Sequence, residues 1–309
     1  MIGRRLISRI RRAALAFFRK RGFIAQAVDQ TGFACCDGGG RGGNFEHDRR
    51  HFLMNGMFCL TAREFGQDVE ICYPNTYDHQ YEYVKRSRRF YEYPYLRYIA
   101  FVGRTKRFKT CFNIGACFAN HALYFSRFMN CTVDCFEPNR NLIELIAFNL
   151  KTANADFATH NIALGDGEGT GETAPCEDNI GASRFVQGAG GAGPTRICAL
   201  DRYAGEKNLR IPDFISVDTE GYEYKILEGA RSILADNNVE IFIEIAKDNM
   251  SLCAGFFHAL GYRRIVRIGK NFHYSKNCNT WERMLFVGYA HFEKAKRELR
   301  RFVVPRYST

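Results

Sequence analysis

The chain has 309 residues, 46% of them hydrophobic, which supports one large domain or one core domain with extensions. Its formal net charge of +11 is concentrated at the two ends. Residues 1–28 hold eight Arg or Lys and no acid, and residues 294–306 hold six basic residues against one Glu. The core between them is nearly neutral, which disfavours a protein that reads nucleic acid through its core.

Residues 1–28 form a basic amphipathic segment. Ile2, Leu6 and Ile10 share one side of a helix, and arginines occupy most of the rest. No uncharged run approaches the about 18 residues of a membrane span, and the arginines interrupt any secretory signal. Three interpretations remain open: a helix packed on its own domain, a helix of residues 1–24 lying on an anionic membrane surface, and an organellar transit peptide. We expect a cytoplasmic protein, with peripheral membrane contact as the alternative.

Two further segments precede the core. Residues 29–56 contain the glycine-rich run 37–44, which lacks the Gly-Lys-Ser/Thr ending of a phosphate loop and follows no apolar strand, so we interpret it as a linker. Residues 57–104 mix many tyrosines with Arg and Lys. We interpret them as an aromatic-rich, mainly helical N-terminal extension packed on the core, with stacking on a sugar or base as the alternative.

The twelve cysteines lack the regular spacing of a disulfide framework and form no Cys-x-x-Cys pair. Several, such as Cys111, Cys135 and Cys198, lie within apolar runs, where a thiol behaves as a small hydrophobic group. We therefore expect reduced thiols in a cytosolic protein, and no zinc site.

Residues 105–292 show the regular pattern of an α/β domain. Strands are expected near 108–112, 131–136, 156–162, 213–218 and 239–245, and helices near 118–128, 139–152 and 222–235. Strands that alternate with helices indicate a parallel sheet covered on both faces, with a ligand crevice at the carboxyl ends of the strands. Asn113, Glu137, Asn161 and Asp218 each stand at or just past such an end, so we expect them to converge on one edge.

The turn after the first of these strands suits a nucleotide. Gly115 and the small Ala116 and Ala119 allow a tight turn and close approach of a ligand, and the free amides of the next helix favour a polar or anionic group. Glu137 ends the second strand, where a carboxylate can accept hydrogen bonds from two ribose hydroxyls.

The rest of the domain closes the sheet and covers the site. Residues 165–196 are glycine-rich and too long for a plain connection, so we expect a loop or hairpin over the site. Residues 262–268 and 284–290 alternate apolar and polar positions, which predicts two antiparallel strands at the far edge. Residues 293–309 are a basic C-terminal tail.

Four motifs follow one another in this domain. They are Asn113-Ile114-Gly115-Ala116 with Asn120-His121-Ala122-Leu123, then Phe136-Glu137-Pro138-Asn139, then Asn161-Ile162-Ala163-Leu164-Gly165-Asp166, then Asp218-Thr219-Glu220-Gly221-Tyr222-Glu223. In type, order and spacing they resemble the FkbM family of S-adenosylmethionine-dependent methyltransferases over about residues 108–245.

The resemblance implies a class I methyltransferase (Rossmann-like) fold, with a mostly parallel seven-stranded sheet that ends in an antiparallel hairpin and has helices on both faces. It also implies S-adenosylmethionine as the cofactor and O-methylation, commonly of a sugar or polyketide hydroxyl. By position, residues 113–119 would wrap the methionine end of the cofactor, Glu137 would hold the ribose, and residues 161–163 would flank the adenine. The cofactor-binding set is then Asn113, Gly115, Ala116, Ala119, Asn120, Glu137, Asn139, Asn161 and Ala163.

Two positions depart from the family pattern. The family usually has Asp where this chain has Asn113, and Gly where it has Ala119. Asn offers hydrogen bonds but no charge for the ammonium of the cofactor, which would weaken binding by about 1–3 kcal/mol. These departures support the alternative of a non-catalytic binding module that keeps the fold.

Methyl transfer is an in-line displacement, for which the nucleophile must be held near the methyl group. An alcohol must also lose its proton to a base. Asp218 is the first candidate because its strand end faces the crevice, and Glu220 and His121 are the alternatives. No metal is required, although Asp218 and Glu220 could bind one. We expect an S-adenosylmethionine-dependent O-methyltransferase acting on a hydroxyl of a sugar, glycan or other small molecule.

The sequence disfavours two other enzyme classes. A dehydrogenase is disfavoured because the turn lacks Gly-x-Gly-x-x-Gly. An RNA methyltransferase using the basic N-terminus is disfavoured by the near-neutral core, so nucleic acid is an unlikely partner.

Overall fold

The computed structural model describes residues 57–174, 176, 179–188 and 194–303, with side chains described as far as residue 291. The predictions for residues 1–28 and 29–56 lie outside this part, as does the end of the C-terminal tail. Residues 293–303 of that tail continue a long helix. Among the described residues, no helix combines the length and the apolar character that crossing a bilayer requires.

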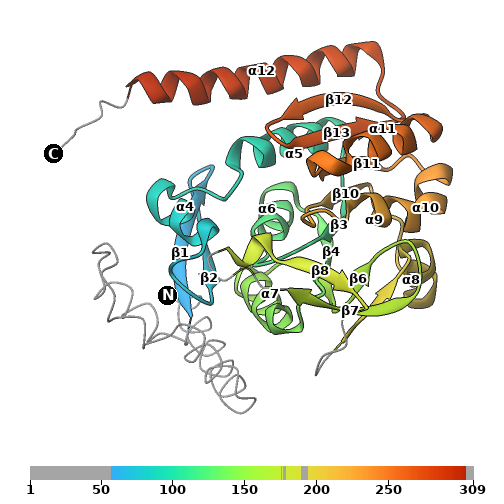
Figure 1. The fold of residues 1–309 in the computed structure, drawn as a ribbon. Coiled ribbons are helices and arrows are strands. Elements are labelled where there is room, and N and C mark those ends of the chain that lie inside the picture. The colour runs from blue at the N-terminus through green and yellow to red at the C-terminus, as the bar shows by residue number, and fades with distance from the viewer. Residues whose placement is uncertain (1–56, 175, 177–178, 189–193, 304–309) are drawn as a thin grey trace.

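A seven-stranded sheet forms the centre of the molecule (Figure 1). In spatial order its strands are β5 (Phe157–His160), β4 (Thr132–Phe136), β3 (Thr110–Ile114), β10 (Phe214–Val217), β11 (Glu240–Glu244), β13 (Asn271–Ser275) and β12 (Arg263–Ile268). All strands point the same way except β13, which is antiparallel to both β11 and β12. The chain order reverses between β3 and β10, which is where ligand crevices open in such sheets. The predicted fold class is confirmed.

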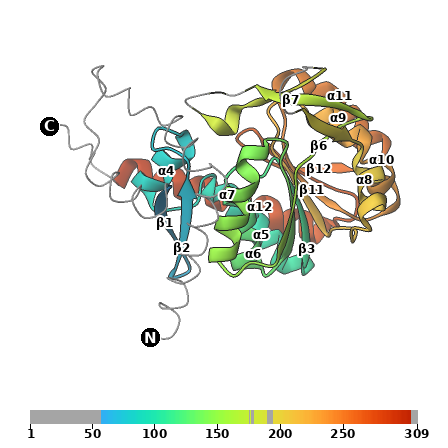
Figure 2. The ribbon, with the colours of Figure 1, turned by 90° about the horizontal axis from the view of Figure 1, so that it is seen from below.

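Helices cover both faces of this sheet, as the view along its edge shows (Figure 2). One face carries α5 (Tyr93–Lys106), α6 (Asn120–Met129) and α7 (Arg140–Thr152). The other carries α8 (Leu200–Lys207), α9 (Glu223–Gly229), α10 (Arg231–Asp236) and α11 (Met250–Ala259). The strands are apolar on both sides because both sides are buried; all four residues of β10, for example, are buried.

The N-terminal extension begins with a hairpin that the sequence pattern did not indicate. Strands β1 (Phe58–Glu64) and β2 (Gln67–Tyr73) pair through a turn at Phe65 and Gly66, both at positive φ, as the tight turns of hairpins require. The helices expected in this segment follow as α4 (His79–Ser87) and α5. The fully buried Asn149 of α7 exchanges two hydrogen bonds of 2.9 Å with the backbone of Cys72. The hairpin is therefore fixed to the core.

The expectation of reduced thiols is wrong for two cysteines. Cys59 and Cys72 face each other across the hairpin and form a disulfide. A spacing of thirteen residues matches no recognised cysteine motif, and only the register of the hairpin brings the two together. The other cysteines in the described part are free: Cys111, Cys117, Cys131, Cys135, Cys176, Cys198, Cys253 and Cys278.

Reduction of this disulfide should destabilise the protein. For a loop of this length, loss of the cross-link is expected to lower the free energy of unfolding by about 3 kcal/mol through the entropy of the unfolded chain. Urea denaturation with and without dithiothreitol measures the effect, and a C59S/C72S variant serves as the control that reductant should no longer change. A wild-type midpoint that is insensitive to reductant would contradict the prediction.

The predicted strand at 284–290 is also wrong. These residues belong to α12 (Thr280–Val303), and the strand that pairs with β12 is β13. A capping box starts the helix: the backbone N–H of Glu282 donates to the Asn279 side chain, and the N–H of Asn279 donates to the Glu282 carboxylate. Helix α12 packs on α5 through Phe286, which is buried, whereas Trp281, Met284 and Leu285 of the same helix are exposed.

The glycine-rich segment 165–196 forms the expected hairpin. Strands β7 (Gly169–Ala174) and β8 (Arg184–Gln187) pair antiparallel in a small sheet with β6 (Ala163–Leu164) and β9 (Thr195–Cys198). A short 3-10 helix, η2 (Ile180–Ala182), lies between β7 and β8. This small sheet continues from the carboxyl end of β5, and it brings the hairpin to the edge where the crevice opens.

Candidate functional site

The turn after β3 approaches the end of β10 so closely that only glycine fits. Gly115 has φ +81°, and a Cβ built on it would overlap the carbonyl oxygen of Asp218. The backbone N–H of Asp218 donates to the carbonyl of Ile114 at 3.0 Å, and the N–H of Gly115 donates to Phe136 at 3.0 Å. These bonds fix the ends of β3, β4 and β10 against one another.

Glu137 follows β4 and is held in place by the backbone of the turn after β3 and of its own turn. Its carboxylate accepts hydrogen bonds from the backbone N–H groups of Cys117 at 3.0 Å and Asn139 at 2.9 Å. Only 7% of the residue is exposed, and this burial raises the pKa of Glu137 to about 7, although the two backbone hydrogen bonds oppose the shift. Each oxygen keeps a lone pair for a further donor.

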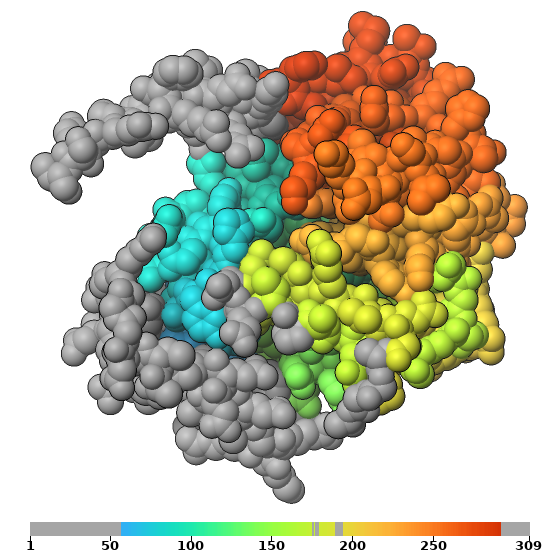
Figure 3. All heavy atoms as spheres, viewed as in Figure 1, coloured from blue at the N-terminus to red at the C-terminus, as the bar shows by residue number. Residues whose placement is uncertain are grey.

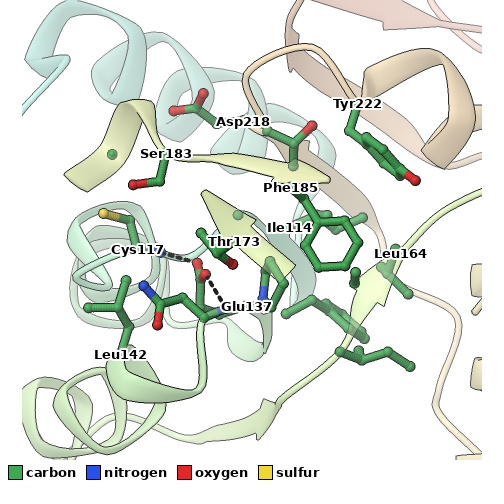
Figure 4. Close-up of a pocket in the computed structure, with 18 of the residues that line it drawn as sticks. Ile114, Cys117, Glu137, Leu142, Leu164, Thr173, Ser183, Phe185, Asp218 and Tyr222 are labelled. Carbon is green, nitrogen blue, oxygen red and sulfur yellow. Dashed lines mark hydrogen bonds between the residues drawn. The ribbon is translucent and has the colours of Figure 1, made fainter. Parts of the chain in front are cut away.

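A first cavity opens above Glu137 (Figure 4). Glu137 lies on the side of Cys117 and Leu142, and Phe185, Leu164 and Tyr222 line the opposite side. The cavity is lined by Ile114, Gly115, Cys117, Phe136, Glu137, Pro138, Asn139, Leu142, Ile162, Ala163, Leu164, Thr173, Ile180, Gly181, Ser183, Phe185, Asp218, Thr219, Tyr222 and Ile226. Apolar walls on the side facing the Glu137 carboxylate suit a flat ring joined to a diol.

A second cavity, of about 410 Å³, lies beside the first. Three distant segments meet around it, the N-terminal extension, the region near residue 180 and the β12–β13 hairpin, which border one another in Figure 3. Asp218 and Gly181 line both cavities, so the two spaces meet at Asp218.

Carboxylates dominate the second cavity. Asp218, Glu220 and Glu244 each place an oxygen within 4.8 Å of the other two. Burial, followed by the charges of Glu92, Glu244 and Glu220, raises the pKa of Asp218 well above its ordinary value. Burial also raises the pKa of Glu244, which pairs with Lys270 at 3.0 Å. Glu220 itself has φ +50°, a left-handed backbone that is costly for a residue with a side chain.

The structure brings about half of the predicted site residues to these cavities. Gly115, Glu137, Asn139 and Ala163 line the first, and Asp218 and Glu220 line the second. Ala116 and Ala119 are buried behind the turn and line neither; Ala119, at φ +64°, holds the left-handed conformation that glycine would favour.

The other predicted residues have partners within the fold. The Asn161 amide donates to the carbonyls of residues 137 and 138, both at 3.0 Å, and Asn120 exchanges two hydrogen bonds with the backbone of Tyr91. His121 faces Glu92, with Nε2 3.3 Å from a carboxylate oxygen. Asn113 is 1% exposed, and neither its oxygen nor its nitrogen finds a hydrogen-bond partner among the described residues.

Sequence reasoning missed several residues that line the cavities. Glu244 ends β11 just as Asp218 follows β10, so the same rule of polar residues at strand ends identifies it. Thr173 and Phe185 come from the glycine-rich hairpin, and Glu92 and Tyr95 come from the extension. No local pattern marks these four, because only the tertiary fold brings them to the site.

The strand order, the glycine turn after β3 and the acidic residue after β4 define a class I methyltransferase fold. Residues 113–264 match the family described as methyltransferase FkbM domain. This part of the chain is therefore a methyltransferase FkbM domain, which confirms the resemblance drawn from the motifs.

Similar solved structures include two methyltransferases. Methyltransferase FkbM of Methylobacillus flagellatus is 16% identical over 54% of this chain and 43% of its own, with a TM-score of 0.40. Precorrin-6y C5,15-methyltransferase of Geobacter metallireducens is 15% identical over 57% of this chain and 85% of its own, with a TM-score of 0.34. The chain thus covers less than half of the first, and at these scores neither informs the substrate. A comparison with curated proteins found no match.

Proposed function

We propose that the protein is an S-adenosylmethionine-dependent O-methyltransferase acting on a hydroxyl of a sugar, glycan or other small molecule. The observation that carries this proposal is the junction of the two cavities at Asp218, next to a turn that only glycine can form. One cavity has the lining for a nucleoside, and the other is open and polar enough for a hydroxylated substrate.

The residues that line the first cavity support this cofactor. Glu137 would accept hydrogen bonds from the ribose hydroxyls with the lone pairs that its backbone donors leave free. Ile162, Ala163 and Leu164 would face the adenine, and the close turn at Gly115 would leave room for the methionine portion. When bound, the cofactor supplies a methyl group on a positively charged sulfur.

We assign the role of base to Asp218. It lies where the two cavities meet, so a substrate hydroxyl in the second cavity would lie next to it. Glu220 lines the same cavity and is the second candidate. His121 does not line either cavity, and its contact with Glu92 favours a role in positioning the extension.

A binding module that has lost catalysis is the second candidate function. The unpartnered amide of Asn113 favours it, because a carboxylate at this position would carry the charge that pairs with an ammonium group. Peripheral membrane contact through residues 1–24 stays a prediction. The disulfide favours an oxidising compartment over the expected cytoplasm.

Asp218→Asn tests the catalytic proposal. With a hydroxyl compound found by screening for transfer of a radiolabelled methyl group, the variant should lower kcat by about 100-fold or more, because the proton acceptor is lost. Its affinity for S-adenosylmethionine should change little. Asp236→Asn, an exposed carboxylate of α10, is the matched control. Undiminished turnover in the Asp218 variant would refute the assigned role.

A further inference from the structure

The carboxylates of the second cavity form a compact oxygen cluster. Asp218, Glu220 and Glu244 come from the ends of two adjacent strands, and each offers an oxygen within 4.8 Å of the others. Glu92 lines the same cavity from the N-terminal extension, held by a 2.7 Å hydrogen bond from Asn271. Carboxylates this close repel one another, so the arrangement favours a cationic ligand.

The protein compensates this charge only in part. Lys270 lies 3.0 Å from Glu244, but its side chain is 75% exposed, so solvent screens the pair. Within the described ranges, no Lys, Arg or His forms an ion pair with Asp218 or Glu220. Apart from Lys270, the described residues therefore provide no cationic side chain that pairs with this cluster.

A buried hydroxyl gives a second and independent indication of a ligand. Tyr95 lines this cavity and is only 4% exposed, yet its hydroxyl finds no hydrogen-bond partner among the described residues. Buried polar groups are nearly always hydrogen-bonded, and a ligand that carries water molecules would provide the missing partner.

Two other clusters of acidic or cysteine residues have bonding partners within the chain. Cys59 and Cys72, near Glu70, are joined in the disulfide. Glu168, Cys198 and Glu206 surround Arg196 and Arg202, which form four ion pairs of 2.7–3.4 Å with the two glutamates. The third such cluster among the described residues is the one in the second cavity. It contains no disulfide, and no arginine pairs with its carboxylates.

We propose that Asp218, Glu220 and Glu244 bind one divalent cation in the substrate cavity. An all-oxygen ligand set selects Mg²⁺ or Mn²⁺ rather than zinc. The catalytic meaning of the site rests on the proposed function. The substrate oxygen would bind the cation, which makes its proton easier to remove. This oxygen would then bond to the methyl carbon as the carbon–sulfur bond breaks; the electron pair would stay on sulfur, and the proton would pass to a carboxylate oxygen of Asp218.

The full chain can be titrated with Mn²⁺ while the electron paramagnetic resonance signal of free Mn²⁺ is recorded. This titration tests the site without measuring activity. The wild type should bind one Mn²⁺ per chain, and Mg²⁺ should displace it. E220Q and E244Q should each weaken binding by roughly tenfold or more, because each loses a charged ligand. E206Q, from the cluster occupied by arginines, should bind as the wild type does. Circular dichroism confirms that each variant is folded.

Three results would overturn the site. The first is that the wild type does not bind Mn²⁺ at millimolar concentration. The second is that both glutamine variants bind Mn²⁺ as tightly as the wild type. The third is that S-adenosylmethionine displaces Mn²⁺, which would mean that the carboxylates bind the positive charge of the cofactor. If S-adenosylmethionine binds and Mn²⁺ does not, the metal site alone is refuted. If neither binds, the proposed function fails as well.

Discussion

Replacing Gly115 with alanine is expected to lower the free energy of unfolding by about 3 kcal/mol or more and to abolish cofactor binding. The new methyl group would overlap the carbonyl oxygen of Asp218, a backbone atom that cannot rotate away. The residue would also have to hold φ +81°, which costs an alanine about 1 kcal/mol. The ends of β3 and β10 would separate, and the two cavities meet at those ends.

Urea denaturation followed by circular dichroism measures this change. Gly205→Ala in α8 is the matched control, because a Cβ there meets no atom within 4 Å and the backbone is helical. The control should be as stable as the wild type or slightly more so. If G115A were as stable as G205A, the turn would not be as tight as the structure shows.

Replacing Glu137 with glutamine is expected to weaken S-adenosylmethionine binding by about 100-fold. The carboxylate would lose charge-assisted hydrogen bonds to the ribose, each worth about 1.5–3 kcal/mol. Calorimetric titration of wild type and variant measures the difference. Equal affinities would remove Glu137 from the cofactor site.

The same residue predicts a pH dependence. Because burial raises the pKa of Glu137 to about 7, the free protein holds this group increasingly protonated as the pH falls below that value. A protonated carboxyl offers fewer acceptor sites, so cofactor affinity should decrease as the pH falls below about 7. The decrease should approach a slope of about tenfold per pH unit, and the affinity should be constant above that pH. The E137Q variant should lose this dependence, which separates Glu137 from other groups that titrate in the same range.

The sequence was most informative where buried strands end. Strands β3, β4, β10 and β11 were predicted within two residues, because a parallel sheet buried on both faces needs continuous apolar runs. The same runs identified Glu137 and Asp218 by the polar residue that follows each strand. The broken helix at 222–235 shows the limit of this reasoning: it divides at Ala230, next to Gly229, where a Cβ would overlap the carbonyl of Gly165.

Local sequence patterns did not predict the residues that line the sides of the two cavities. Phe185 and Glu92 are more than ninety residues apart and reach the site through hairpins and helices whose placement depends on tertiary packing. The amides of Asn120, which begins α6, and of Asn161, which follows β5, bond to backbone carbonyls, so a polar residue near the site can also serve the fold. The strand predicted at 284–290 had a readable signal against it, since Asn279 and Glu282 have the spacing of a capping box.

Equilibrium dialysis of the full chain against radiolabelled S-adenosylmethionine tests the central claim most directly. We predict one molecule bound per chain with a dissociation constant of about micromolar order, and competition by S-adenosylhomocysteine. A folded wild-type protein that binds neither compound would contradict the account. It would mean that Asn113 and Ala119 leave the first cavity unable to hold the cofactor.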